Sequence, residues 1–502
     1  MALPNRYEHP EWNDPSLFLA LDESWIDSSD GADFKFCPLE KNASPILFPD
    51  QTWEGGEDGK PRPVHADPFL ANIVRDVEDG RYLLWYNSMN IGIGRTSDPG
   101  MEKSGPITVP GRGSRICFAT SSDGLRWEKP DLGLVSYHGN TRNNMVPLPG
   151  SPLLSDHLSA VFPTRHEGAA TPLAASIYST FPDPVYHSGI TQMFSTDGFR
   201  WDLHYPPTLP LDGDAHCVSW DANTQTYLCT TRSAQHTRIA TRFLKRGIQT
   251  INNKRHVALA QSRDLLHWTP FLDILEADDE DPENAQLYQM YIVPYGNLYI
   301  GFVEVFYMGR EMSTGPLEIQ LAISHDLVNW KRAGRRQPFL ARGEAGSWDA
   351  SHVIPTNNPP FAEGDRLRFW YSGSDAEHWQ LGHSALSTGT IRRDGFARWH
   401  TEGEGSLTTV PLDIRWASWP EVNVDASTGA VWMEILDEAG HPLPGLAREN
   451  FQAITGDHVR ATCRFDLPRG TFLRHTGKVR LRFHLRNASL YAVRAPNVRM
   501  DR

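Results

Sequence analysis

The sequence predicts an all-β protein, a five-bladed β-propeller followed by a C-terminal β-sandwich. Three observations support this prediction. The chain of 502 residues contains 40 Gly and 37 Pro, a usage typical of short strands joined by tight turns. One short pattern recurs five times. After the fifth copy the pattern stops, and apolar and polar side chains alternate instead.

The repeated pattern is Asp followed by Gly or Leu, with a Trp four or five residues later. The Asp carboxylate accepts backbone N–H groups in a tight turn, and we expect the Trp to begin the next strand and to fill the gap between neighbouring sheets. One strand precedes each turn, and two more precede that strand, as 286–294 and 298–306 do in the fourth copy. Four strands repeated at this length are typical of a propeller blade. The five copies are 122–127, 196–201, 263–268, 325–330 and 393–399.

Three segments are expected. Residues 1–50 would close the ring by pairing with the last blade, and residues 51–404 would form the propeller, which is the expected catalytic domain. Residues 405–502 would form the β-sandwich, because 430–436 and 479–485 alternate apolar and polar side chains.

Composition argues against several classes of protein and of site. A formal net charge of -13 argues against nucleic-acid binding. The sequence shows neither an apolar run long enough for a bilayer nor a secretory signal, so we expect no membrane partner and a cytoplasmic protein. The five cysteines are widely spaced without a CxxC pair, so neither a disulfide framework nor a thiolate zinc site is expected. No cofactor and no metal are predicted, and the oligomeric state is not indicated.

Acidic side chains recur where each blade should reach one mouth of the central channel. In a propeller the innermost strand of each blade begins at one mouth of the central channel, and the second strand returns to that mouth. An Asp or Glu, often with a His, falls at this mouth in every blade. The candidate catalytic carboxylates are Asp67, Asp214, Glu304, Glu283 and Asp349. The candidate substrate-binding residues are His65, His157, His216, Arg232, Trp348, His352 and His378.

Paired carboxylates are what glycoside hydrolysis requires, because one protonates the leaving oxygen while the other attacks the anomeric carbon or activates water. Glu304 lies in an apolar run, where burial would raise its pKa as a general acid needs, and Glu283 is the alternative acid. Structural roles stay open for the others. Asp67 could start a turn, Asp214 could cap a loop, and Asp349 could brace blade five.

The architecture resembles that of the glycoside hydrolase family 32 fructosidases and of the superfamily they share with families 43, 62 and 68. The element His65-Ala66-Asp67-Pro68 is similar to the Asn-Asp-Pro element of the fructosidases, and this resemblance implies the nucleophile role for Asp67. Residues 127–134, with Asn143 and Asn144 after them, resemble propeller proteins labelled family 32-like. The Arg-Asp-Pro and Glu-Cys elements of the fructosidases do not occur in the sequence. The role of the stabilising acid is therefore assigned to Asp214 from its position alone.

The leading hypothesis is an exo-acting glycoside hydrolase that cleaves a fructofuranoside, arabinofuranoside or similar bond, with a carbohydrate as its partner. Two alternatives stay open. A glycoside phosphorylase resembling family 130 would need one acid and a cationic phosphate clamp, for which Arg232, His216 and His378 are candidates. A non-catalytic sugar-binding propeller would hold its mouth carboxylates in separate ion pairs.

Overall fold

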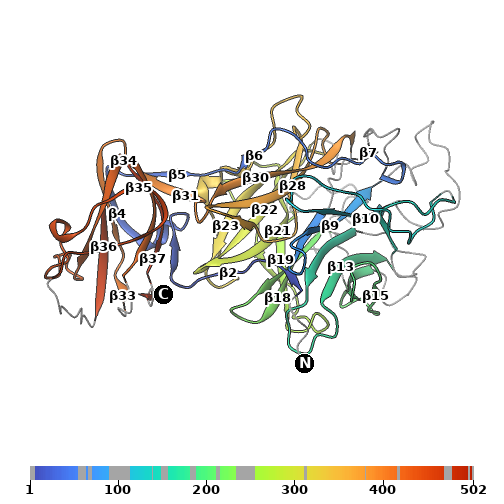
Figure 1. The fold of residues 1–502 in the computed structure, drawn as a ribbon, viewed down its shortest axis with the longest axis horizontal. Coiled ribbons are helices and arrows are strands. Elements are labelled where there is room, and N and C mark those ends of the chain that lie inside the picture. The colour runs from blue at the N-terminus through green and yellow to red at the C-terminus, as the bar shows by residue number, and fades with distance from the viewer. Residues whose placement is uncertain are drawn as a thin grey trace.

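The predicted all-β class is confirmed by the structure, a computed structural model in which the propeller and the C-terminal sheets lie side by side (Figure 1). Apart from strands, the described residues form only single 3-10 turns. No helix among them is long and apolar enough to cross a membrane. The structure describes residues 6–54, 64–65, 71–89, 114–137, 139–147, 157–180, 188–210, 215–232, 255–309, 314–378, 380–414, 419–467, 477–495 and 498–499.

The five predicted blades are confirmed, each an antiparallel sheet of four or more strands. Blade one contains β8 (Ala71–Asp76), β9 (Tyr82–Met89), β10 (Ser114–Ser121) and β11 (Met145–Val146). Blade two contains β12 (His157–Pro163), β13 (Leu173–Thr180), β14 (Ser188–Ser195), β15 (Asp202–Leu203) and β16 (Leu209–Pro210). Blade three contains β17 (His216–Asp221), β18 (Thr226–Arg232), β19 (Val257–Ser262) and β20 (Leu272–Leu275).

Blades four and five are joined into one sheet by a single parallel pairing between Leu317 and His352. Blade four contains β21 (Ala285–Gly296), β22 (Leu298–Tyr307), β23 (Leu317–Ser324), β24 (Trp330–Arg332) and β25 (Pro338–Leu340). Blade five contains β26 (His352–Pro355), β27 (Phe361–Glu363), β28 (Arg366–Ser374) and β30 (Ser384–Arg392). Its outer strand is β6 (Glu40–Lys41), so the N-terminal segment completes the last blade. A short pair of β7 (Val64–His65) and β29 (Leu381–Gly382) links the segment before blade one to the connection between β28 and β30 of blade five.

The repeated turns hold the blades in shape. In blade one, Asp123 Oδ1 accepts the backbone N–H groups of Leu125 and Arg126 at 2.8 Å, and Ser121 Oγ accepts that of Gly124 at 2.9 Å. Gly124 has a φ of 71°, which a residue without Cβ adopts at little cost. The same bonds recur in the next three blades, so the predicted turn chemistry is confirmed.

Two of the gaps between blades contain a tryptophan that is not part of the repeat. Trp85 on β9 donates from Nε1 to the carbonyl oxygen of Gly198 in the turn of blade two at 2.8 Å. Trp370 on β28 does the same to Gly124 in the turn of blade one. The repeat tryptophans, such as Trp201, donate instead to the carbonyl of their own turn. The sequence located these turns correctly, and Trp201 is buried in the cluster that joins blades one and two, but the parts of Trp85 and Trp370 in filling gaps were not predicted.

The N-terminal segment is shared between the two units. Its strand β1 (Tyr7–Glu8) pairs with β8 of blade one, and β2 (Trp12–Asn13) pairs in parallel with β21 of blade four. This segment therefore crosses the propeller at the end opposite to where the innermost strands begin. The next three strands, β3 (Leu17–Leu19), β4 (Ile26–Asp30) and β5 (Asp33–Phe36), pair with C-terminal strands. The expected boundaries at residues 50 and 404 stay predictions.

The C-terminal unit is a second β-sheet region with its own apolar interior, part of a core cluster that continues into blades four and five. Strict alternation in β36 (Lys478–Arg486) puts Val479, Leu481, Phe483 and Leu485 inside, as the sequence predicts. Its other strands are β31 (Ala397–His400), β32 (Glu404–Thr409), β33 (Leu412–Ile414), β34 (Glu421–Leu436), β35 (Ile454–Thr462), β37 (Ser489–Arg494) and β38 (Val498–Arg499).

Candidate active site

The candidate site is the propeller mouth at which the innermost strands begin and the second strands end. Of the predicted catalytic carboxylates, Asp67 and Asp214 lie outside the described residues. The side chains of His65 and His157 also lie outside them, although their backbones belong to β7 and β12. The roles assigned to these four residues stay predictions.

One position on the second strand of each blade carries a polar side chain. In blades one to four it pairs with the aliphatic residue five places before the serine of the turn, as Glu304 pairs with Ile319 and Arg232 with Val257. In blade five the positive φ of the turn belongs to the Asp itself, Asp394, and not to the residue after it. The equivalent pair in this blade is therefore Ser372 with Leu386. These equivalent positions form a ring around the channel in which Glu304 is the one carboxylate. The ring consists of Asn87, Tyr178, Arg232, Glu304 and Ser372.

Glu304 is buried in this ring, with 1% of its surface exposed. Its Oε1 accepts a hydrogen bond from Nε2 of Gln289 on β21, and its Oε2 has no hydrogen-bond partner among the described residues. Burial raises the pKa of the Glu304 carboxyl to about 8, although the bond from Gln289 acts in the opposite direction. Glu304 is therefore mainly protonated at neutral pH, the state from which a carboxyl group can give up a proton.

Three predicted substrate-binding residues gather around Tyr288, the neighbour of Gln289 in β21. Arg232 donates from Nη1 to the Tyr288 hydroxyl at 3.4 Å, and a hydrogen bond of 3.2 Å joins that hydroxyl to Nε2 of His378. The ring centroid of His352 lies 5.8 Å from that of His378. Blades three, four and five thus each contribute a side chain to one group.

The other predicted residues lie apart from this group. His216 is buried and bonded through Nε2 to the Ser176 hydroxyl of blade two at 3.0 Å. Asp349 forms an ion pair of 2.7 Å with Lys41 on the outer strand of blade five, and Trp348 stacks on Tyr371. Glu283 is exposed just before β21. These contacts favour the bracing role for Asp349 that the sequence left open.

The floor of the channel is built by the residues that follow β26. The backbone N–H of Asn357 donates to the carbonyl oxygen of Ala71 in blade one at 3.1 Å, and its side chain accepts from Cys217 Sγ of blade three at 3.2 Å. Asn358 accepts the backbone N–H of Ile73 at 3.1 Å. These bonds cross from blade five to blades one and three, so the chain itself spans the channel below Glu304.

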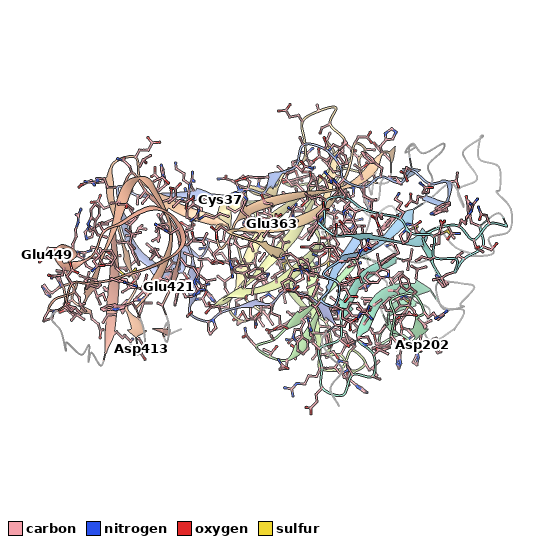
Figure 2. All side chains as sticks on the ribbon, viewed as in Figure 1. Cys37, Asp202, Glu363, Asp413, Glu421 and Glu449 are labelled. Atoms are coloured by element: carbon pink, nitrogen blue, oxygen red, sulfur yellow. The ribbon has the colours of Figure 1, made fainter. Side chains whose placement is uncertain are left out.

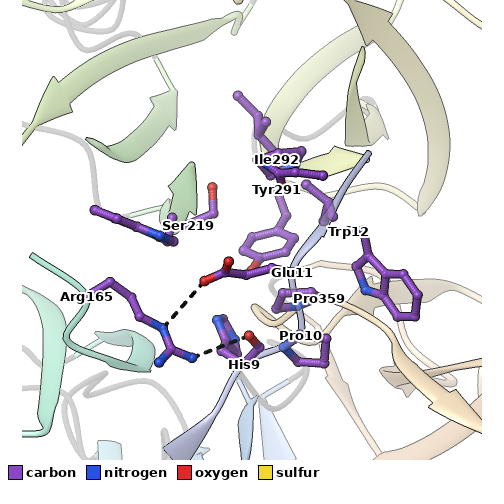
Figure 3. Close-up of a pocket in the computed structure, with 13 residues that line it drawn as sticks. His9, Pro10, Glu11, Trp12, Arg165, Ser219, Tyr291, Ile292 and Pro359 are labelled. Carbon is purple, nitrogen blue, oxygen red and sulfur yellow. Dashed lines mark hydrogen bonds and ion pairs between the residues drawn. The ribbon is translucent and has the colours of Figure 1, made fainter. Parts of the chain in front are cut away.

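Below this floor the N-terminal segment covers a small pocket (Figure 3). Arg165 of blade two lies 3.9 Å from a carboxylate oxygen of Glu11 and donates to the carbonyl oxygens of Tyr7 at 3.4 Å and His9 at 3.5 Å. Burial lowers the pKa of His9 to about 3, so its ring is neutral at ordinary pH. Because the base of the channel is covered in this way, a ligand would reach Glu304 from the mouth.

Sequence reasoning missed Gln289 and Tyr288, both in the innermost strand of blade four. A usable signal was present, since Gln289 interrupts the otherwise apolar run of 287–293. A polar residue at such a position is expected to have a buried partner. The partner itself, Glu304, follows only from the register of β21 against β22, which contains an irregularity between Leu287 and Met290.

The raised pKa of Glu304 predicts a pH-dependent stability. Between the pKa of an unfolded Glu, about 4.3, and the folded value of about 8, the folded state keeps a proton that the unfolded state has lost. The free energy of unfolding of the wild type should therefore fall as the pH rises through this window. The free energy of unfolding of Glu304→Gln, taken relative to that of the wild type, should therefore rise by on the order of 3–5 kcal/mol between pH 5 and 8. Urea unfolding of both proteins measures the difference, and a difference that is constant with pH contradicts a buried neutral Glu304.

No cluster of three or more His, Cys, Asp or Glu side chains that could hold a metal ion occurs among the residues described. The acidic residues labelled on the C-terminal unit in Figure 2, Asp413, Glu421 and Glu449, lie away from the propeller mouth. They are not part of the candidate site.

Comparison with known proteins finds solved structures with a similar fold. No protein-family model matches the chain. A search of curated proteins finds no match either. Among solved structures, a β-1,2-mannobiose phosphorylase from Listeria innocua aligns over 70% of this chain and 96% of its own, with 11% identity and a TM-score of 0.45.

Two further solved structures are similar. An N-acetylgalactosamine deacetylase from F. plautii, in complex with blood group B trisaccharide, aligns over 71% of this chain and 96% of its own, with 15% identity and a TM-score of 0.40. A thermostable family-43 glycoside hydrolase aligns over 65% of this chain and 91% of its own, with 13% identity and a TM-score of 0.40. The neighbours are thus carbohydrate-active enzymes of differing activity, distantly similar to this chain.

Proposed function

We propose that the protein is a glycoside hydrolase in which Glu304 protonates the leaving oxygen. The observation that carries this proposal is a buried carboxyl group that stays protonated at neutral pH and has one oxygen without a partner among the described residues. A general acid needs a pKa near the working pH, because it must hold its proton in the resting enzyme and release it in the transition state. Gln289 holds the other oxygen and so orients the group.

A second carboxylate must attack the sugar or activate water, and the sequence assigns this role to Asp67, with Asp214 as the stabilising acid. The covered base of the channel supports action on a chain end, because a long polymer could not thread through. The sugar ring would lie above Asn357, with its leaving group beside Glu304.

The test is hydrolysis of a panel of 4-nitrophenyl furanosides and pyranosides by the wild type, with and without inorganic phosphate, compared with Asp67→Asn. We expect release of 4-nitrophenol without phosphate and a loss of at least about 100-fold in the variant. Release that requires phosphate would identify a phosphorylase instead. Activity that survives Asp67→Asn would refute the assignment of the nucleophile, and a silent panel would favour a binding protein.

A further inference from the structure

The innermost strand of blade four has an irregularity opposite Glu304. The pairing of β21 with β22 is interrupted between Leu287 and Met290, so that two residues of β21 lie opposite one residue of β22. Counted from Leu287, Tyr288 is the partner of Glu304, and counted from Met290 the partner is Gln289. Such a bulge turns an additional side chain toward the residue opposite it. Glu304 therefore faces two polar side chains where a regular ladder would offer one.

A single hydrogen bond holds the Glu304 carboxyl group. Glu304 and Gln289 are both buried, and Nε2 of the Gln289 amide donates to Oε1 of Glu304. The other oxygen, Oε2, has no hydrogen-bond partner in the part of the chain that the structure describes. The two oxygens, which are equivalent in a free carboxyl group, therefore lie in different surroundings.

This difference determines which oxygen carries the acidic proton. A protonated carboxyl group has one carbonyl oxygen and one hydroxyl oxygen, and an N–H donor bonds to the carbonyl oxygen because it is the better acceptor. We propose that Gln289 is a positioning residue that keeps the acidic proton of Glu304 on Oε2. The use made of this proton rests on the proposed function, but its place on Oε2 does not require catalysis. The oxygen that is not bonded to Gln289 is then the one that presents the proton to a leaving group.

The same hydrogen bond affects the pH at which Glu304 loses its proton. An N–H donor stabilises a carboxylate more than it stabilises the neutral acid. Burial raises the pKa of the Glu304 carboxyl, and the bond from Gln289 opposes that rise. Without the amide the buried carboxylate would have no donor, so its pKa should rise further. Gln289 thus keeps this pKa closer to the pH at which a general acid works.

The neighbouring ionisable groups do not replace the amide. Burial raises the pKa of the Cys217 thiol and of the Tyr291 hydroxyl, so both stay neutral when Glu304 loses its proton. Among the described residues Glu304 has no ion pair, and β23 presents only apolar side chains on its face of the sheet. The other ionisable side chains near this part of β21 are Tyr288, Arg232, His352 and His378. They are the same in a Gln289 variant, so comparison with the wild type isolates the amide.

Infrared difference spectroscopy of the full chain measures the proton directly. A protonated carboxyl group absorbs apart from a carboxylate, and Glu304→Gln identifies the band of protonated Glu304 (the Glu304 band) by removing it. In the wild type this band should fade as the pH rises through about 8. In Gln289→Met, which keeps the side-chain volume but has no donor, it should fade at a pH about one to two units higher.

The matched control is Gln192→Met in β14 of blade two. Gln192 is also a buried glutamine, but its amide donates to the Ser176 hydroxyl at 3.4 Å and not to a carboxyl group. The Glu304 band of this variant should fade at the same pH as in the wild type. A thermal melt of each variant checks that it is folded. If Gln289→Met does not fold, Gln289→Asn, which draws the amide back by one methylene, should give an upward shift in the same way.

Two results would overturn the inference. A Glu304 band that fades at the same pH in the wild type and in the folded Gln289 variant would show that the amide does not hold the carboxyl group. A band that fades at a lower pH in the variant would show that the amide is reversed, so that its oxygen accepts the acidic proton and favours the protonated form.

Kinetics separates this inference from the proposed function. If Glu304 is the proton donor, the alkaline limb of kcat/KM should move with the Glu304 band in Gln289→Met, and kcat on glycosides with poor leaving groups should fall about tenfold. A band that shifts in a protein without hydrolytic activity would keep the place of the proton and refute the hydrolase. Hydrolysis that depends on Glu304, with an alkaline limb unchanged in Gln289→Met, would keep the hydrolase and refute the role of Gln289.

Discussion

Glu304→Gln is expected to lose about 10²- to 10⁴-fold in kcat on glycosides with poor leaving groups, while hydrolysis of activated 2,4-dinitrophenyl glycosides changes little. An alkoxide is too basic to depart without a proton, whereas dinitrophenolate departs unaided. Gln has nearly the same shape as Glu and can still bond Gln289, but it carries no acidic proton. The measurement is kcat and kcat/KM across a series of leaving groups, compared with the wild type.

Two other variants make this experiment decisive. Asp67→Asn should lose activity on both kinds of substrate, because a nucleophile or base is needed whatever the leaving group. Glu449→Gln, which changes an exposed glutamate on the C-terminal unit (Figure 2), should behave as the wild type. A Glu304→Gln enzyme impaired equally on all leaving groups, or impaired on none, would contradict the role of Glu304 as proton donor.

Trp85→Ala is expected to lower the free energy of unfolding by about 3–5 kcal/mol. Trp85 is 1% exposed, fills the gap between blades one and two, and donates to the carbonyl oxygen of Gly198. Contact is close, since a Cβ added to Gly198 would lie 2.5 Å from the Trp85 ring. The truncation leaves a cavity and removes one of the two indole N–H bonds to the Gly198 carbonyl oxygen, and rigid neighbouring sheets cannot collapse to fill the space.

Urea unfolding of the wild type and the variant measures this effect. Trp370→Ala, in the equivalent place between blades five and one, should cost a similar amount. The control is Leu272→Ala, which truncates a side chain that is 52% exposed and should change stability by less than about 0.5 kcal/mol. A cost below about 1 kcal/mol for Trp85→Ala would show that the blades are held together elsewhere.

The blades could be predicted from sequence because their signals are local. The turn requires Asp and a residue that tolerates positive φ within a few positions, and five copies of it fix the number of blades. That Trp85 fills the gap between blades one and two together with Trp201 could not be predicted. It depends on which face of a strand meets the next sheet, and a single repeat does not encode that relation.

The candidate site was partly predictable for the same reason. Glu304 stands out as an acid in an apolar run, and its burial follows from that run. Its bond to Gln289 depends on strand register, and the floor formed by Asn357 depends on bonds from blade five to blades one and three. Long-range pairings of this kind have no signature in local sequence, and neither do the N-terminal strands that join the C-terminal sheet.

Those N-terminal strands have a consequence for how the protein is made. Leu17 pairs with Arg494, and Asp33 pairs with His400, so these N-terminal strands have partners that are synthesised much later. Until those later strands have been synthesised, β3 to β5 must remain without their partners, and the last blade lacks its closing strand if β6 is held away with them. Closing such long loops is entropically costly and slow, and exposed strand edges invite aggregation meanwhile. The final yield of folded protein should therefore depend on chaperones that protect the N-terminal segment during synthesis.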